Sequence, residues 1–251
     1  MKIIKIVKLK NGLYNIELNK LTIKTFDEII IKYNLLYKKE IDDDLLLKIM
    51  NDSKYYDIYN KALNYAVKRV RCENDIYYYL SNLEVKNSDI KSIIDKLKKI
   101  NIINDKLYVR CYINDKLKLS KDGINKIKID LLNKNINIDI INEEIENIDI
   151  DINEKLKKLI IKKINSNHKY SNYFLKNKII RDMINLGYEQ SVIDEIFEQN
   201  KKDDYNILIY NYRILLNKYK NKYKDKILES KIKSKLYMYG FLYENIKKED
   251  L

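Results

Sequence analysis

The chain has 251 residues, of which 45% are hydrophobic and 35% charged, and its 50 Lys and Arg against 37 Asp and Glu give a net charge of +13. It contains no Pro, no Trp and four Gly, which argues against a β-sandwich or barrel and against a Gly/Ser-rich or Pro-rich linker. The positive surplus favours phosphate backbones or acidic protein surfaces as partners, although the bias toward Lys, Asn, Ile and Tyr is also what an AT-rich genome encodes.

Residues 3 to 26 predict a small β-hairpin or meander. The segment from Ile3 to Leu9 is rich in β-branched residues, and apolar alternation resumes at Leu13. Between them lies Asn11-Gly12, the dipeptide that best suits a tight type I′ turn. So small a sheet is not stable alone, and we expect it to pack on a helix.

Helices are predicted from there to the end of the chain. Thr25 or Asp27 can cap a short helix over residues 26–33. Asp42-Asp43-Asp44 places acids at the positive end of the next helix, and we interpret this triplet as a helix start rather than a metal cluster.

The strongest signal is an internal repeat. Four positions that we call anchors are spaced by 51, 52 and 53 residues: Val85, Ile136, Tyr188 and Phe241. The residues nine before, five before and five after each anchor are all apolar. They are Ile76, Ile127, Ile179 and Ile232, then Leu80, Leu131, Met183 and Leu236, then Ile90, Ile141, Ile193 and Ile246. This spacing predicts one buried helix face before the anchor and a second helix after it.

The residue before each anchor is predicted to end a helix. Gly187 and Gly240 tolerate the left-handed conformation found there, as does Asn135, whereas Glu84 fits least well. A further helix precedes each of these, at about 56–70, 105–117, 153–165 and 204–219. Asp105 and Asn153 are the expected N-caps of two of them.

We therefore predict a mainly α fold with about four tandem three-helix repeats in an elongated curved array, preceded by the β-hairpin or meander. The predicted boundaries are 1-55 for the N-terminal β-hairpin with short helices, and 56-103, 104-151, 152-202 and 203-251 for the repeats. A single unit of this size barely buries a core, so neighbouring units are expected to stack.

The sequence contains no recognisable enzyme constellation. The one histidine, His168, lies in a polar loop, and no phosphate-binding Gly motif or Ser/His/Asp order occurs. Asp149 to Asn153 resembles the start of a calcium loop, but Ile160 stands where the chelating Glu belongs. We expect no catalytic residues, no cofactor and no metal.

Cys72 and Cys111 form no CxxC pair and are expected to be buried free thiols. The start of the chain lacks a signal-peptide core, and no apolar run approaches the roughly 18 residues of a membrane span. These features predict a cytoplasmic protein that is a monomer and does not bind membranes.

Partner binding is assigned to cations near the junctions of the first two helices of each repeat, because they lie off the apolar face and should be exposed. They are Lys68, Arg69, Arg71, Lys116, Lys118, Lys121, Lys126, Lys128, Lys176, Lys178 and Arg181. Arg69 and Arg71 rank first, since Arg is scarce here and can bind carboxylate or phosphate with two hydrogen bonds. The alternative is a solvated helix face whose long side chains cover core edges. Most of the 23 Tyr are expected in the core, with Tyr212, Tyr219 and Tyr223 as surface candidates.

The order of these motifs over nearly the whole chain resembles the RecX family, the regulatory proteins of the RecA recombinase. The segments that carry the resemblance are Ala62-Leu63-Asn64-Tyr65, Arg69-Val70-Arg71-Cys72-Glu73-Asn74-Asp75-Ile76, Ile102-Ile103-Asn104-Asp105 and Gly123-Ile124. Asn11 to Leu18 is similar to the N-terminal extension of longer members from Gram-positive bacteria. Cys72 stands in place of the usual Ser, Asn135 in place of Gly, and Lys106 in place of an acid.

The resemblance implies a protein that binds the RecA–DNA filament in its helical groove, bridges adjacent protomers and inhibits ATP turnover and strand exchange in DNA repair. Two alternatives remain open. One is a helical-repeat protein that binds DNA directly through its basic surface, and the other is a helical-repeat scaffold for another protein. The sequence argues mildly against the DNA binder, because no unit shows a basic recognition helix followed by polar base readers.

Overall fold

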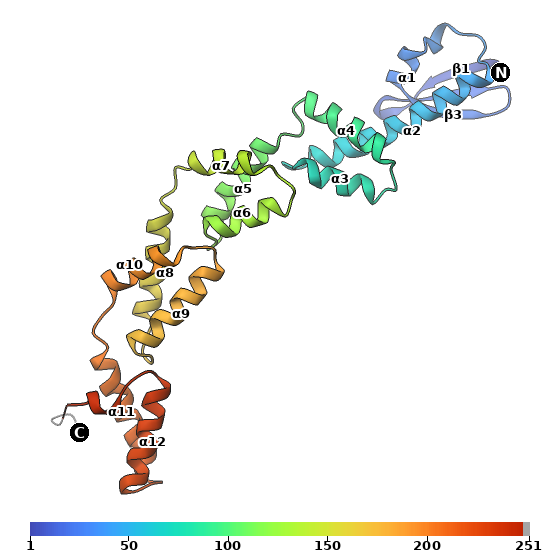
Figure 1. The fold of residues 1–251 in the computed structure, drawn as a ribbon. Coiled ribbons are helices and arrows are strands. Elements are labelled where there is room, and N and C mark those ends of the chain that lie inside the picture. The colour runs from blue at the N-terminus through green and yellow to red at the C-terminus, as the bar shows by residue number, and fades with distance from the viewer. Residues whose placement is uncertain (248–251) are drawn as a thin grey trace. The chain divides into compact units, whose positions relative to one another are not determined.

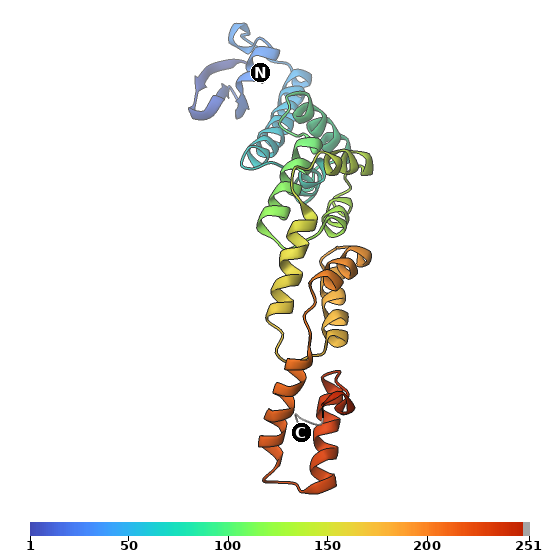
Figure 2. The same ribbon diagram turned by 90° about the vertical axis from the view of Figure 1, so that its left-hand side faces the viewer.

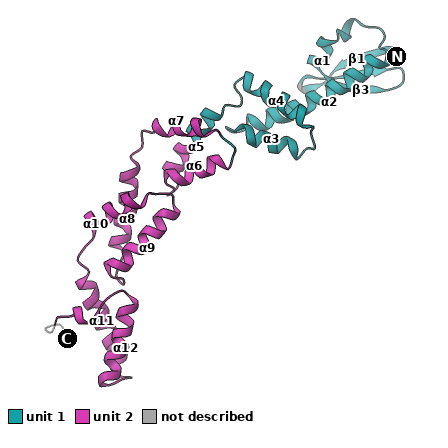
Figure 3. Cartoon of the chain, in the orientation of Figure 1, with its two compact units in different colours: residues 1–111, 134–136 teal, residues 112–133, 137–251 magenta. Residues whose placement is uncertain are grey.

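The computed structural model describes residues 1–247, with the side chain of Asn11 excepted. The chain divides into two compact units, which Figure 3 distinguishes by colour. Unit 1 comprises residues 1–111 and 134–136, and unit 2 comprises residues 112–133 and 137–251. The boundary falls inside the helix α5 (Asp105–Leu119).

Unit 1 begins with a three-stranded antiparallel sheet of order β1-β2-β3, formed by β1 (Ile3–Lys8), β2 (Leu13–Leu18) and β3 (Thr22–Phe26). The predicted meander is thus confirmed, but the two-residue turn is wrong. Lys8 pairs with Tyr14, and the chain between them includes the short 3-10 helix η1 (Lys10–Gly12). The Leu9 amide donates to the carbonyl of Leu13 at 2.7 Å, which closes a longer loop.

The sheet packs on α1 (Asp27–Lys32), η2 (Leu35–Tyr37) and the long helix α2 (Asp43–Ala66), as expected (Figure 1). Its core includes the fully buried Ile16, Ile29, Leu35, Ile41 and Ile49. The sheet and its helices therefore share one apolar core.

The predicted caps of α1 and α2 differ in outcome. Asp42 caps α2, because its carboxylate accepts from the Leu45 amide at 2.7 Å. Neither Thr25 nor Asp27 makes an N-cap hydrogen bond at α1, whose N-cap position is Phe26. The Thr25 hydroxyl is instead buried and bonds to Ser53 Oγ at 2.6 Å, which ties β3 to α2.

Helices make up the rest of the described chain, so the mainly α prediction is confirmed. They are α3 (Glu73–Ser81), α4 (Asn87–Lys99), α5, α6 (Ile124–Leu132), α7 (Ile138–Glu146), α8 (Ile152–Asn165), α9 (Asn172–Asn185), α10 (Gln190–Asn200), α11 (Tyr205–Tyr219), α12 (Asp225–Met238) and the 3-10 turn η3 (Tyr243–Asn245). We group them as module one (α2–α4), module two (α5–α7), module three (α8–α10) and module four (α11–η3). The boundaries given from the sequence stay a prediction.

The apolar columns of the repeat are buried. Ile76, Ile127, Ile179 and Ile232 lie on α3, α6, α9 and α12 and are at most 2% exposed. The columns at −5 and +5 are at most 6% exposed, and of the anchors only Val85 is half-buried. Modules one, three and four each have an apolar cluster of this kind, and α11 and α12 of module four lie side by side in Figure 2.

The residue before each anchor takes the left-handed conformation in all four modules. Its φ is 57° at Glu84 and Asn135 and 86° at Gly187 and Gly240. The amide of the following anchor donates to the carbonyl five residues back, at 3.1 Å for Tyr188 and 2.9 Å for Phe241. This bond is the defining one of a Schellman helix end.

Three expectations about module ends need correction. The cap of α5 is Asn104, which accepts from the Leu107 amide at 3.0 Å, and not Asp105. The cap of α8 is Asp151, which accepts from the Glu154 amide at 2.9 Å, and not Asn153. The first helix of module one begins at Asp43, well before residue 56, because α2 also covers the sheet. The third helix expected in module four falls largely on residues outside the described part of the chain.

Candidate docking surfaces at the module joints

Within unit 2, two module joints bring the start of the second helix of one module against the end of the second helix of the next. At the joint of modules two and three, the Gly123 amide donates to the Leu186 carbonyl at 2.6 Å. At the joint of modules three and four, the Ser171 amide donates to the Tyr239 carbonyl at 2.9 Å. The left-handed helix ends therefore also serve as caps for the preceding module.

Gly187 and Gly240 are required at these joints for two reasons. Both have positive φ, which glycine adopts without a steric penalty. A Cβ added to Gly187 would collide with the backbone nitrogen of Lys126, and one added to Gly240 would collide with Ser171 and Phe174. Close approach of the two helices thus depends on the missing side chain.

The joint of modules one and two, within unit 1, contains a half-buried ion pair. Lys134 Nζ lies 2.8 Å from Asp75 Oδ1 and 5.6 Å from the centroid of the Tyr108 ring. Burial acts to lower the pKa of Lys134, but the bond to Asp75 outweighs it and the pKa is raised. Burial likewise acts to raise the pKa of Asp75, and the bond to Lys134 lowers it. The pair therefore stays ionised at neutral pH.

Acids at the start of the next module complete the capping of two helices. Asp105 Oδ1 accepts from the Glu73 amide at 2.9 Å, where α3 has no side-chain cap of its own. Asp204 Oδ2 accepts from the Asn172 amide at the start of α9 at 2.6 Å. Burial raises the pKa of Asp105. Asp105 thus caps α3 at the joint and does not cap its own helix, α5.

Arg71 was expected to be exposed, and that expectation is wrong. It is 7% exposed, its guanidinium carbon lies 3.5 Å from the Tyr65 ring centroid, and its Nε donates to the Tyr65 carbonyl at 3.2 Å. The physical reason is that α2 ends at Ala66 and the chain reverses, which lays the planar guanidinium over Tyr65.

Four lysines of the predicted set are half-buried and bind acids or an amide of their own module. The pairs are Lys116 with Asp122 and Asp130, Lys126 with Asp122, Lys128 with Asn142, and Lys176 with Asp194 and Glu198. Lys116, Lys128 and Lys176 link neighbouring helices, whereas Lys126 pairs with the segment just before its own helix. These bonds leave less of their charge for a partner.

The other six predicted cations are exposed. They are Lys68 and Arg69 between α2 and α3, Lys118 in the last turn of α5, Lys121 between α5 and α6, and Lys178 and Arg181 on α9. Lys178 lies 5.4 Å from the Tyr170 ring centroid, and within residues 1–247 none of the six forms an ion pair. Their binding role stays a prediction.

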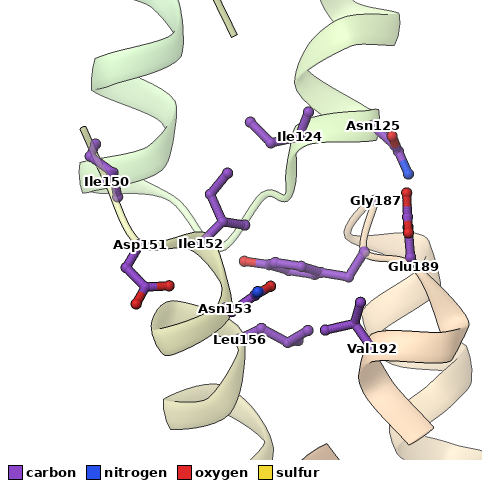
Figure 4. Close-up of a pocket in the computed structure, with 11 residues that line it drawn as sticks. Ile124, Asn125, Ile150, Asp151, Ile152, Asn153, Leu156, Gly187, Glu189 and Val192 are labelled. Atoms are coloured by element: carbon purple, nitrogen blue, oxygen red, sulfur yellow. The ribbon is translucent and has the colours of Figure 1, made fainter. Parts of the chain in front are cut away.

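A shallow hollow of about 380 Å³ lies at the joint of modules two and three (Figure 4). Ile152, Leu156 and Val192 form part of its apolar wall. Asp151, at its edge, is already used as the cap of α8. The predicted cations are not part of its lining, so this hollow belongs to the packing of the joint.

A second hollow lies along α9 and brings together two predicted cations and three aromatic rings. It measures about 510 Å³ and is lined by Tyr170, Tyr173, Phe174, Asn177, Lys178 and Arg181. The sequence does not single out the aromatic members, because most tyrosines are expected in the core and Phe174 belongs to no repeat column. The available signal was the spacing of Leu175, Ile179 and Met183, which defines the buried face of α9 and leaves Tyr173 and Phe174 outside it.

The Cys and His expectations can also be checked. Cys72 is buried and free, and burial raises the pKa of its thiol to about 11, whereas Cys111 is only half-buried. His168 is exposed in its loop. In the described part of the chain, no three His, Cys, Asp or Glu side chains are grouped to hold a metal. Every helix there is too short or too polar to cross a bilayer.

The fold and its joints define a protein of short helical modules that follow a small sheet in the chain. No protein-family model matches the chain. It is 30% identical over 191 residues to regulatory protein RecX of Clostridioides difficile, covering 75% of this chain and 90% of that relative. It is 31% identical over 169 residues to regulatory protein RecX of Finegoldia magna, covering 66% of this chain and 82% of that relative.

Solved structures agree. A crystal structure titled regulatory protein RecX matches with a TM-score of 0.68 at 22% identity, over 79% of this chain and all of that one. RecX from Lactobacillus salivarius matches with a TM-score of 0.54 at 29% identity, over 58% of this chain and 95% of that one. The chain belongs to the RecX family of regulatory proteins.

Proposed function

We propose that this protein binds the RecA recombinase filament in its helical groove and inhibits its ATPase, strand exchange and filament growth in DNA repair. Family membership supports this, and the observation that carries it is the 30% identity to a regulatory protein RecX over 90% of that relative's length. The proposal includes a cytoplasmic monomer that acts by binding and not by catalysis.

The exposed cations suggest how such binding would be distributed. Lys68 and Arg69 belong to module one, Lys118 and Lys121 to module two, and Lys178 and Arg181 to module three. Individual exposed charge pairs contribute little, but contacts made by linked modules reinforce one another. Acidic groups of RecA and phosphates of the DNA it holds are the chemistry these cations would bind.

The test is a titration of RecA's DNA-dependent ATPase with the full chain. We expect suppression at less than one molecule per RecA, because each molecule would bridge neighbouring protomers. Absence of suppression at saturating protein would reject the proposal.

A charge-reversal variant examines the contact surface. We expect Lys68→Glu with Arg69→Glu to weaken suppression about tenfold, since both charges would face acidic groups. The matched control is Lys38→Glu with Lys39→Glu, another pair of adjacent exposed cations in unit 1. Equal weakening in both variants would show that net charge matters and not this surface.

A further inference from the structure

Two aromatic rings are exposed at the hollow along α9. Tyr173 is 70% exposed and Phe174 is 41% exposed, and their rings meet edge to face at 5.9 Å. We call the group Tyr170, Tyr173, Phe174, Lys178 and Arg181, with the neighbouring Lys169, the aromatic–basic surface. Large rings left in water in a group commonly mark a binding surface.

Two rings of this surface, those of Phe174 and Tyr170, contact the joint of modules three and four. The Phe174 ring lies so close to Gly240 that a Cβ on Gly240 would collide with it. Tyr170 contacts Tyr239 edge to face at 6.2 Å. A ligand that stacks on fixed rings loses less side-chain freedom on binding.

The charge of the surface is one-sided. Lys169 Nζ lies 4.8 Å from the Tyr239 ring centroid and 5.3 Å from that of Tyr170, and Lys178 Nζ lies 5.4 Å from the latter. The lining of the hollow includes Lys178 and Arg181 and no acidic side chain. By contrast, the hollow in Figure 4 is lined by Asp151 and Glu189 and by no cation. The α9 surface therefore suits an anionic ligand.

The repeat itself does not require this combination. Counted from the anchors, Phe174, Lys178 and Arg181 correspond to Ile227, Lys231 and Ser234 in module four. In module two the same positions hold Asp122, Lys126 and Ile129. The module fold is thus compatible with other residues at these places, and packing alone does not account for the aromatic and basic set.

We propose that the aromatic–basic surface binds single-stranded nucleic acid, with unpaired bases stacked on Tyr173 and Phe174 and phosphates bound by Lys169, Lys178 and Arg181. Aromatic side chains beside cations are how proteins bind single strands without sequence preference. An acidic peptide would use the cations and leave the rings idle, and the bases of a duplex are not available for stacking. This binding needs no recombinase and does not rest on the proposed function.

The test uses the full chain without RecA and a fluorescent oligothymidylate of about 15 nucleotides, followed by fluorescence anisotropy. We expect Tyr173→Ala with Phe174→Leu to raise Kd at least about thirtyfold, since both rings on which bases stack are removed. The matched control is Tyr210→Ala, which removes a 57% exposed ring on α11 outside this hollow. Circular dichroism would verify that all variants are folded.

Lys178→Gln with Arg181→Gln should also raise Kd and make the salt dependence of log Kd shallower, because two phosphate contacts are lost. Phe174→Tyr should retain binding, which separates stacking from a general loss of structure. Unchanged affinity of the Tyr173 and Phe174 variant, or an equal loss in Tyr210→Ala, would overturn the proposal.

Two competitors identify the ligand class. A duplex of the same length, or poly-glutamate, that displaces the oligothymidylate as well as unlabelled single strand would overturn single-strand binding in favour of simple charge attraction. The ATPase titration is independent of these results. Loss of single-strand binding in the Tyr173 and Phe174 variant with ATPase suppression intact would show that the rings bind single strands and are not needed for suppression, and that outcome supports the assignment.

Discussion

The guanidinium of Arg71 lies 3.5 Å from the centroid of the Tyr65 ring, and its Nε donates to the Tyr65 carbonyl. The Tyr65 ring is also stacked on the ring of Tyr79, nearly parallel to it, with the two centroids 4.0 Å apart. Arg71 thereby holds the loop before α3 against the end of α2, and the stack of Tyr65 on Tyr79 joins α2 to α3. Arg69, two residues earlier, is exposed. Two arginines of one sequence motif thus have separable roles.

Replacing each arginine distinguishes these roles. Arg71→Ala should lower the free energy of unfolding by about 2 kcal/mol, because it removes a buried cation–π contact and leaves a carbonyl without its donor. Arg69→Ala should change it by less than about 0.5 kcal/mol, as is usual at exposed sites. Urea denaturation followed by circular dichroism measures both. Arg71→Lys should restore stability only in part, since an ammonium cannot stack as a plane; full restoration would contradict this account.

The pair of Lys134 and Asp75 should make the stability of unit 1 depend on pH. The pKa of Asp75 is lowered in the folded chain, so its contribution is present above the unfolded value of about 4 and is lost as pH falls through the folded value. Asp75→Asn should therefore destabilise the protein by about 1 kcal/mol near pH 7. On acidification to about pH 3, the difference from wild type should shrink.

The measurement is urea unfolding of both proteins at a series of pH values. Asp149→Asn is the control, because that carboxylate is exposed and should give a small difference at every pH. If the difference in free energy of unfolding between wild type and Asp75→Asn stays constant down to pH 3, the ion pair does not contribute to stability.

Substitutions at two equivalent left-handed helix ends, Glu84 and Gly240, should change the stability in opposite directions. Glu84 has φ 57° although it carries a side chain, and this costs about 1 kcal/mol relative to glycine. Glu84→Gly should therefore stabilise the protein, by about 0.5 kcal/mol once the greater entropy of glycine in the unfolded chain is subtracted. Gly240→Ala should destabilise it by more than about 1 kcal/mol, since it adds strain and a collision with Ser171. Thermal unfolding of both variants suffices, and a destabilised Glu84→Gly would mean that the Glu84 side chain has a contact of its own.

Much of the fold was predictable because it depends on local spacing. The columns of Ile76 and Leu80 and their equivalents are set by a helical period, and the turn before each anchor is set by the next buried residue. Glu84 also takes the left-handed conformation. Its residue type argues against that conformation, but its position in the repeat requires it.

What the sequence did not indicate depends on contacts between elements. Nothing local distinguishes the exposed Arg69 from the buried Arg71, because the difference arises where α2 ends and the chain turns back on Tyr65. Tyr212, expected on the surface, is buried in the core of module four. The exposed ring of Tyr173 was not indicated either, because tyrosine is common throughout the chain and most of its tyrosines were expected in the core.

Asp105 offers a last test of how the modules are joined. Its carboxylate accepts the Glu73 amide hydrogen at the start of α3, so Asp105→Ala should cost about 1 kcal/mol, as loss of a helix cap does. Asp105→Asn keeps an acceptor oxygen. Because burial raises the pKa of Asp105, ionising it in the folded chain is unfavourable, and that penalty grows as pH rises from the unfolded value of about 4 through the folded one. Above that range Asp105→Asn should be as stable as wild type or slightly more so, the reverse of Asp75→Asn. Urea unfolding at about pH 7 compares the two directly, and equal losses in Asp105→Ala and Asp105→Asn would show that the joint needs the charge and not the hydrogen bond.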